Sequence, residues 1–83
     1  MILESTPIQG LCLATSEARR DLRGSFRRVF CRQALAGSGQ PFEVSQANVS
    51  LTLGRGTLRG MHFQNAPAAE AKLVRCLRGR VFD

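Results

Sequence analysis

The chain has 83 residues, which suits one small domain or part of one and excludes two compact domains. Hydrophobic residues make up 43% of it and charged residues 22%, an ordinary globular composition that argues against full disorder. Twelve basic residues against six acidic ones give a net charge of +6, which favours an anionic partner: a nucleic acid, an anionic membrane surface or a phosphorylated small molecule. Eleven of the basic residues are Arg, whose guanidinium suits phosphate and carboxylate, although a GC-rich genome also raises the Arg content.

Cysteine content and hydropathy bear on the cellular compartment. Cys12, Cys31 and Cys76 are odd in number and far apart, which argues against a disulfide framework or a zinc ribbon and predicts a reducing cytosol. Each lies in an apolar-rich run, so we expect small core residues. No apolar run approaches the roughly 18 residues of a membrane span, and the N-terminus lacks the pattern of a secretion signal. We therefore expect a cytoplasmic protein with no membrane partner.

The first half of the chain predicts short strands and one helical turn. Residues 8–15 form an apolar-leaning run and predict a strand, whereas residues 16–21 are polar and predict a loop. Residues 25–31 alternate in polarity and predict a second strand. Residues 32–36 can form one helical turn, which the Gly- and Pro-containing cluster at 37–41 ends.

The second half predicts further strands. The alternating residues 42–53 predict a long strand that ends at a hairpin signal, Gly54-Arg55-Gly56. A loop over 65–70 and a turn at 78–79 separate the remaining expected strands, which are 57–64, 72–77 and 81–83. Short strands between Gly-bearing turns predict an all-β sandwich or barrel. The last residues resemble the start of a strand that has no partner, so we expect the N-terminal part of a longer protein.

Few side chains in this sequence can carry acid–base chemistry. His62 is the single His, and a His has the unperturbed pKa nearest to physiological pH, which makes it the default general base. Lys72 is the single Lys and lies ten positions later. Taken alone, a His in a strand is more often structural, and a Lys at the end of a strand is usually solvated.

Two further groups could bind a ligand. Gln46 and Asn48 share one face of a predicted strand; if buried, their amides must bond either each other and the backbone or a polar ligand. Arg23 follows a predicted loop and either belongs to a turn stabilised by Asp21 or binds phosphate.

Several motifs occur in one order along the chain. They are Thr6-x-Ile8-x-Gly10-Leu11, Asp21-x-Arg23-Gly24-x-Phe26, Gln46-x-Asn48-x-Ser50, Leu58-Arg59-Gly60-x-His62-x-Gln64, Lys72-Leu73-Val74-Arg75 and Gly79-x-Val81-x-Asp83. Any one of them is weak evidence, whereas the set in this order and at these spacings is specific. The series closely resembles the dTDP-4-dehydrorhamnose 3,5-epimerase family over nearly the whole chain.

The resemblance implies a fold and an activity. The fold is all-β, a cupin-like jelly roll longer than this chain, so that residues 1–83 correspond to the N-terminal part of a single domain. The complete protein is expected to be a homodimer in which N-terminal strands reach into the partner. The implied reaction is 3,5-epimerisation of a dTDP-linked 4-keto-6-deoxy sugar in dTDP-rhamnose biosynthesis. No cofactor and no metal is implied, because the C4 ketone itself acidifies the α protons.

The matching motif positions imply residue roles. His62 matches the family's proton acceptor, which removes the protons at C5 and C3, both α to the C4 ketone. Lys72 matches the group near the C4 oxygen, where a cation stabilises the charge of the developing enolate. Arg59 matches a contact to substrate and phosphate. The remaining nucleotide-binding positions are Arg23, Gln46, Ala47 and Asn48, of which Ala47 contributes backbone atoms only.

The sequence also departs from the family pattern. Arg28 stands where the family usually has a Glu that helps to hold the nucleotide base, so a strict preference for dTDP is in question. The family's proton-donor Tyr and the carboxylate that orients its catalytic His belong to its C-terminal half, and this chain has no Tyr. Strict alternation places Arg59 and His62 on opposite faces of a strand, which a bulge at Gly60 would correct.

Two other functions stay open. Arg28 favours a single-centre epimerase or a ketoisomerase of the same fold that acts on another nucleotide sugar. The basic charge also allows a small nucleic-acid-binding module, but the chain has only five Phe for both core and base stacking, and the ordered motifs are then unexplained. We therefore expect an epimerase with no nucleic-acid partner.

Overall fold

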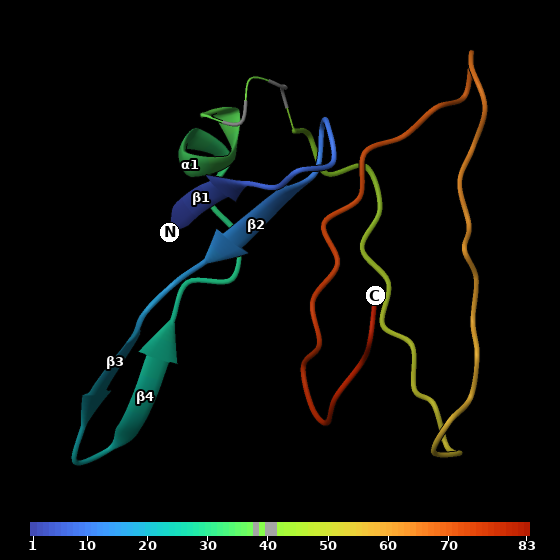
Figure 1. Ribbon diagram of the computed structural model, residues 1–83. Helices are drawn as coiled ribbons and strands as arrows, with labels where there is room; N and C mark the ends of the chain where they lie inside the picture. The colour runs from blue at the N-terminus through green and yellow to red at the C-terminus, as the bar shows by residue number, and fades with distance from the viewer. Residues whose placement is uncertain (38, 40–41) are drawn as a thin grey trace. The chain divides into compact units, whose positions relative to one another are not determined.

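The computed structural model describes residues 1–37, 39 and 42–83. The chain divides into two units, Met1–Ala47 and Asn48–Asp83, each with its own internal contacts (Figure 1). The helix and strands of the described residues all lie in the first unit. They are β1 (Ile2–Ser5), β2 (Cys12–Thr15), β3 (Ala18–Asp21), β4 (Gly24–Arg27) and α1 (Arg32–Ala36).

β1 and β2 form an antiparallel hairpin, with Ile2 opposite Thr15 and Ser5 opposite Cys12. The strand expected at 8–15 is therefore shorter than predicted, and β1 is a strand that the sequence pattern did not reveal. Residues 6–11 form the connection, in which the Thr6 hydroxyl donates to the Leu11 carbonyl oxygen at 3.0 Å and accepts from the Ile8 N–H at 3.2 Å. Because these side-chain bonds hold the connection in a turn, it cannot continue β2.

β3 and β4 form a second antiparallel hairpin, joined by the two-residue loop Leu22-Arg23. The prediction of a loop over 16–21 is wrong, because Ala18–Asp21 is a strand. Pairing with β4 supplies its backbone hydrogen bonds, and a strand that is solvated on both faces requires no apolar residues. The strand expected at 25–31 is present only as far as Arg27.

The helical turn expected at 32–36 is confirmed as α1. Its Leu35 is the only buried hydrophobic side chain among the described residues, and α1 lies against β1 (Figure 1). Next to the helix, the rings of Phe30 and Phe42 lie 6.3 Å apart, and Arg32 forms an ion pair with Glu43 at 3.2 Å. Gly37 ends the helix; of the predicted turn cluster 37–41, Ser38, Gln40 and Pro41 lie outside the described residues.

The second unit consists of extended segments joined by turns (Figure 1). None of residues 42–83 lies in a helix or a strand, so the strands expected at 42–53, 57–64, 72–77 and 81–83 are wrong. An alternating sequence becomes a strand only when a neighbouring backbone satisfies its N–H and C=O groups. The turns themselves are where the sequence places them. The Thr57 N–H bonds to the Gly54 oxygen at 3.4 Å, and the Ala68 N–H bonds to the Asn65 oxygen at 2.9 Å.

The all-β fold class is confirmed, because the regular structure consists of antiparallel strands apart from one helix of five residues.

Cys12 and Cys76 are exposed and Cys31 is half-buried, which contradicts their prediction as core residues. At the start of α1, a hydrogen bond from the Ala34 N–H lowers the pKa of the Cys31 thiol. Within the described residues, no helix is both long enough and apolar enough to cross a membrane.

The 83-residue chain on its own is expected to self-associate. Twenty large hydrophobic side chains are exposed, whereas Leu35 alone is buried among the described residues, so association removes much apolar surface from water. Sedimentation velocity should show concentration-dependent oligomers, and the dye ANS should bind. A monodisperse monomer with a sharp cooperative melt contradicts this prediction.

Candidate active site

His62 and Lys72 are joined by a hydrogen bond in the second unit. The Lys72 Nζ donates to the main-chain oxygen of His62 at 2.9 Å. The chain between them reverses its direction through the turn that Asn65 and Ala68 close. The structure thus brings the single Lys to the backbone of the single His, from which the exposed imidazole projects. Their catalytic roles remain predictions.

Glu70 also holds Lys72. Its Oε1 lies 3.3 Å from the Lys72 Nζ, and the Lys and Glu side chains are 43% and 45% exposed. Glu70 belongs to the predicted loop over 65–70, and no role is predicted for it from the sequence. Its spacing from Lys72 was the signal available in the sequence, because residues i and i+2 of an extended segment point to the same side. A carbonyl oxygen and a carboxylate oxygen therefore restrain one ammonium group from two sides.

Gly60 makes room for the His62 ring. Its φ of +94° is rare for any residue with a side chain, and a Cβ placed there lies 3.1 Å from the His62 Nδ1 and 3.4 Å from the His62 main-chain nitrogen. The expected bulge at Gly60 requires a partner strand, which this segment does not have. The regular alternation is instead broken by the positive φ itself.

Arg59 reaches back across the preceding turn. Its Nη2 donates to the main-chain oxygen of Leu51 at 3.1 Å. The turn between them is closed by Thr57, whose hydroxyl donates to the Gly54 oxygen at 2.7 Å. This bond ties the guanidinium to the segment before the turn, and the predicted substrate contact of Arg59 remains a prediction.

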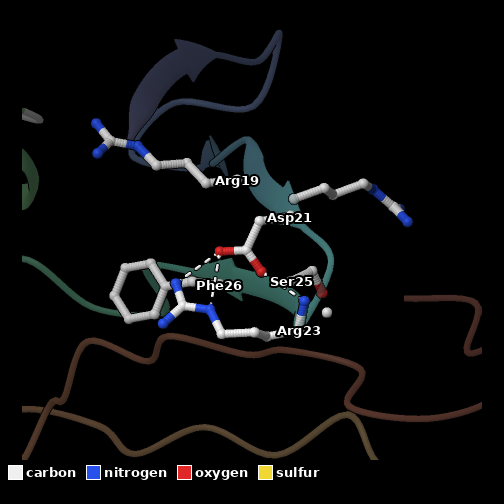
Figure 2. A pocket seen from close by; sticks show the side chains of 7 residues that line it. Arg19, Asp21, Arg23, Ser25 and Phe26 are labelled. Atoms are coloured by element: carbon white, nitrogen blue, oxygen red, sulfur yellow. Dashed lines mark hydrogen bonds and ion pairs between the residues drawn. The ribbon is translucent and has the colours of Figure 1, made fainter.

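Arg23 belongs to the first unit, where Asp21 holds it in the loop between β3 and β4. The Asp21 Oδ1 accepts the main-chain N–H of Arg23 at 2.8 Å, and its Oδ2 accepts Nη2 at 2.6 Å and Nε at 3.2 Å (Figure 2). The expected Asp21-stabilised turn is therefore present. The hydrogen bonds from Arg23 lower the pKa of Asp21, and the same pairing raises the pKa of Arg23. Since the two side chains are 52% and 90% exposed, the pair orients Arg23 more than it stabilises the fold.

A pocket of about 420 Å³, which we call the hairpin pocket, opens beside this ion pair. All of its lining comes from the β3–β4 hairpin (Figure 2). Its polar and aromatic lining residues are Arg19, Arg20, Asp21, Arg23, Ser25 and Phe26. Of the predicted site residues, the pocket contains Arg23.

Gln46, Ala47 and Asn48 are all exposed, so water can satisfy the two amides without a protein partner. Gln46 and Ala47 are the last two residues of the first unit, which also contains Arg23. Asn48 is the first residue of the second unit, which also contains Arg59, His62 and Lys72. The substrate-binding roles of Gln46, Ala47 and Asn48 remain predictions. Among the described residues, no group of His, Cys, Asp or Glu side chains is arranged to hold a metal ion.

Comparison with known proteins gives a family and relatives. The family model for dTDP-4-dehydrorhamnose 3,5-epimerase matches residues 5–83. The chain is 40% identical over its whole length to a protein of Streptomyces niveus named dTDP-4-dehydrorhamnose 3-epimerase, of which it covers 40%. It is 39% identical over its whole length to a dTDP-4-dehydrorhamnose 3,5-epimerase of Mycolicibacterium smegmatis, of which it covers 41%.

A third relative is the enzyme of the same name from Shigella flexneri, which is 42% identical over 76% of this chain and 35% of its own length. The chain thus spans about two fifths of the length of the curated relatives that it matches. No solved structure matches the chain.

Replacing Gly60 with Ala is expected to displace the His62 imidazole. The added methyl group would lie 3.1 Å from Nδ1. The alanine would also have to keep the positive φ of Gly60, which costs a residue with a side chain about 1–2 kcal/mol. Gly79→Ala is the matched control, because Gly79 has a similar φ of +87° and nothing within 4 Å of an added Cβ. In nitrogen–proton spectra of the complete protein, the His62 ring signals should move in Gly60→Ala and stay in Gly79→Ala. Equal shifts in the two variants contradict this account of Gly60.

Proposed function

Because this chain belongs to the dTDP-4-dehydrorhamnose 3,5-epimerase family, we propose that the complete protein epimerises a dTDP-linked 4-keto-6-deoxy sugar next to its ketone. The observation that carries the proposal is the hydrogen bond that places the ammonium of Lys72 beside the backbone of His62. Residues 1–83 supply the N-terminal part of a single cupin-like domain in this proposal. The protein acts in the cytoplasm, as a homodimer and without a cofactor.

In the proposed reaction, His62 is the base. Its imidazole takes a proton from a carbon α to the C4 ketone, and the electron pair of the broken C–H bond moves into an enolate whose negative charge lies on the C4 oxygen. An ammonium group has three N–H donors, and His62 and Glu70 supply acceptors for two. The third is free to donate to the C4 oxygen, where a positive charge lowers the barrier to enolate formation.

The second half of the reaction returns a proton to the opposite face of the same carbon, which inverts its configuration and restores the ketone. In the family that this chain resembles, a Tyr gives this proton, and these 83 residues contain no Tyr. General acid assistance is worth about 10²–10⁴-fold in rate. We therefore propose that the acid comes from outside residues 1–83 and that these residues alone do not epimerise the sugar at a useful rate.

Substrate binding is assigned to Arg23, Gln46, Ala47, Asn48 and Arg59. The guanidinium groups suit the phosphates of a nucleotide sugar, since they donate two parallel hydrogen bonds to phosphate oxygens. The two exposed amides can each donate and accept, as the edge of a nucleotide base requires.

A second candidate function is epimerisation at a single carbon. Its support is the name of the Streptomyces niveus relative, which specifies a 3-epimerase, together with the Arg at position 28. Both functions use the same base, and in both the negative charge of the enolate lies on the C4 oxygen. They differ in whether the sugar can present C5 as well as C3 to His62.

Proton exchange in heavy water tests the function. With dTDP-4-keto-6-deoxyglucose and the complete protein, the proton NMR signals at C3 and C5 should disappear as an inverted product accumulates. Loss of the C3 signal alone favours the single-centre enzyme. His62→Ala should abolish exchange at both carbons, because the base is missing. Rapid exchange in His62→Ala, or epimerisation at enzymatic speed by the 83 residues alone, contradicts the assigned mechanism.

Replacing Glu70 with Gln is expected to lower kcat up to about fivefold and to leave KM unchanged, because the negative charge that restrains Lys72 is removed close to where the charge of the enolate develops. This size corresponds to the roughly 1 kcal/mol upper range of an exposed ion pair. Glu43→Gln is the matched control, since it breaks the ion pair with Arg32 at 3.2 Å in the first unit. The assay is steady-state epimerisation by the complete protein. Equal kcat in wild type and Glu70→Gln excludes a positioning role for Glu70.

A further inference from the structure

The hairpin pocket is more basic than its one ion pair requires. Three Arg side chains line it, Arg19, Arg20 and Arg23, against a single carboxylate, that of Asp21. Both oxygens of Asp21 accept hydrogen bonds from Arg23. The lining therefore carries more positive than negative charge, which suits an anionic ligand such as a phosphate group.

The register of the hairpin decides which Arg can act together with Arg23. Arg19 of β3 is directly opposite Phe26 of β4, and side chains of directly opposite residues lie on the same face of an antiparallel pair. Asp21, two positions after Arg19, shares that face and holds Arg23 there. Arg20 and Arg27 have the opposite parity and belong to the other face.

Figure 2 agrees with this register. The guanidinium of Arg19, the ring of Phe26 and the guanidinium of Arg23 extend to the same side of the hairpin. Arg23 is oriented by the carboxylate of Asp21, which leaves part of its guanidinium edge open to a ligand. Phe26 is 70% exposed and adds an apolar surface to the pocket lining.

We propose that Arg19 is a further substrate-binding residue, which together with Arg23 binds the diphosphate group of the nucleotide sugar in the hairpin pocket. Two guanidinium groups on one face can donate to oxygens of both phosphates, and Arg is suited to such bidentate contacts. The identity of the ligand rests on the proposed function. The pairing of Arg19 with Arg23 rests on the hairpin alone.

Calorimetric binding to the complete protein tests this assignment, with dTDP, inorganic pyrophosphate and thymidine as probes. Arg19→Ala should weaken dTDP and pyrophosphate binding about tenfold, the loss of one charge-assisted contact, and leave thymidine binding unchanged. Arg27→Ala is the matched control, because it removes the same charge from the same hairpin but from the other face and outside the pocket. It should change dTDP binding less than twofold. Arg19→Gln, which keeps a polar side chain of similar reach, replaces Arg19→Ala if that variant does not fold.

Equal effects of Arg19→Ala and Arg27→Ala on dTDP binding overturn the proposal, because binding then depends on the total charge of the hairpin and not on the pocket. A duplex oligonucleotide that binds more tightly than dTDP and depends equally on Arg19 also overturns it. If the complete protein does not exchange the sugar protons but Arg19→Ala still loses pyrophosphate, the proposed function fails and this inference stands. If exchange occurs and Arg19→Ala binds dTDP normally, the inference alone fails.

Discussion

Backbone pairing between neighbours in sequence is the constraint on which the rest of this structure depends. A strand requires a partner for its N–H and C=O groups, and here each strand finds that partner in the next one along the chain. Both pairs span only four residues per strand. Such short hairpins bury little, and accordingly Leu35 is the only buried hydrophobic side chain among the described residues.

The same constraint explains how the candidate site is organised. In the second unit, side chains are held by main-chain oxygens, as Lys72 is by His62 and Arg59 by Leu51, instead of by packing. Gly60 leaves space for the His62 ring because it has no Cβ; an added Cβ would lie 3.1 Å from the His62 Nδ1. Positioning of this kind depends on backbone conformation. A catalytic geometry that requires about 0.5 Å precision therefore needs further packing around these residues.

Sequence predicted the local features of this molecule better than the pairings. The helix at Arg32–Ala36 and the turns at Gly54 and Asn65 are present because each is fixed by residues within a few positions. The expected strands between 42 and 83 are absent, since alternation specifies a face but not the partner that must lie alongside. Conversely, Ala18–Asp21 was predicted as a loop from its polarity, and pairing with β4 made it a strand.

The residues of the candidate site show the same contrast between what the local sequence predicts and what only the pairing of residues reveals. The family motifs identified His62, Lys72 and Arg23 as residues of interest, and the structure gives each a specific partner. Glu70 and Arg19 belong to no motif, so their proposed roles appear only once the ion pair and the strand register are known. A motif records which residues a reaction uses, whereas charge balance and register show which neighbours restrain them.

Arg28 is a position at which this chain reverses the charge expected from the family pattern. The Ser16 hydroxyl donates to its main-chain oxygen at 2.7 Å, which ties residue 28 to the chain entering β3 whatever its side chain is. In the family that this chain resembles, a Glu at this position helps to hold the base. A carboxylate only accepts hydrogen bonds and a guanidinium only donates them, so Arg28 cannot replace the contact to a base N–H. An Arg can donate to carbonyl oxygens of a base or to a further phosphate, so we expect Arg28 to favour the acceptors of the base and the charge of the nucleotide over the donor pattern of the base.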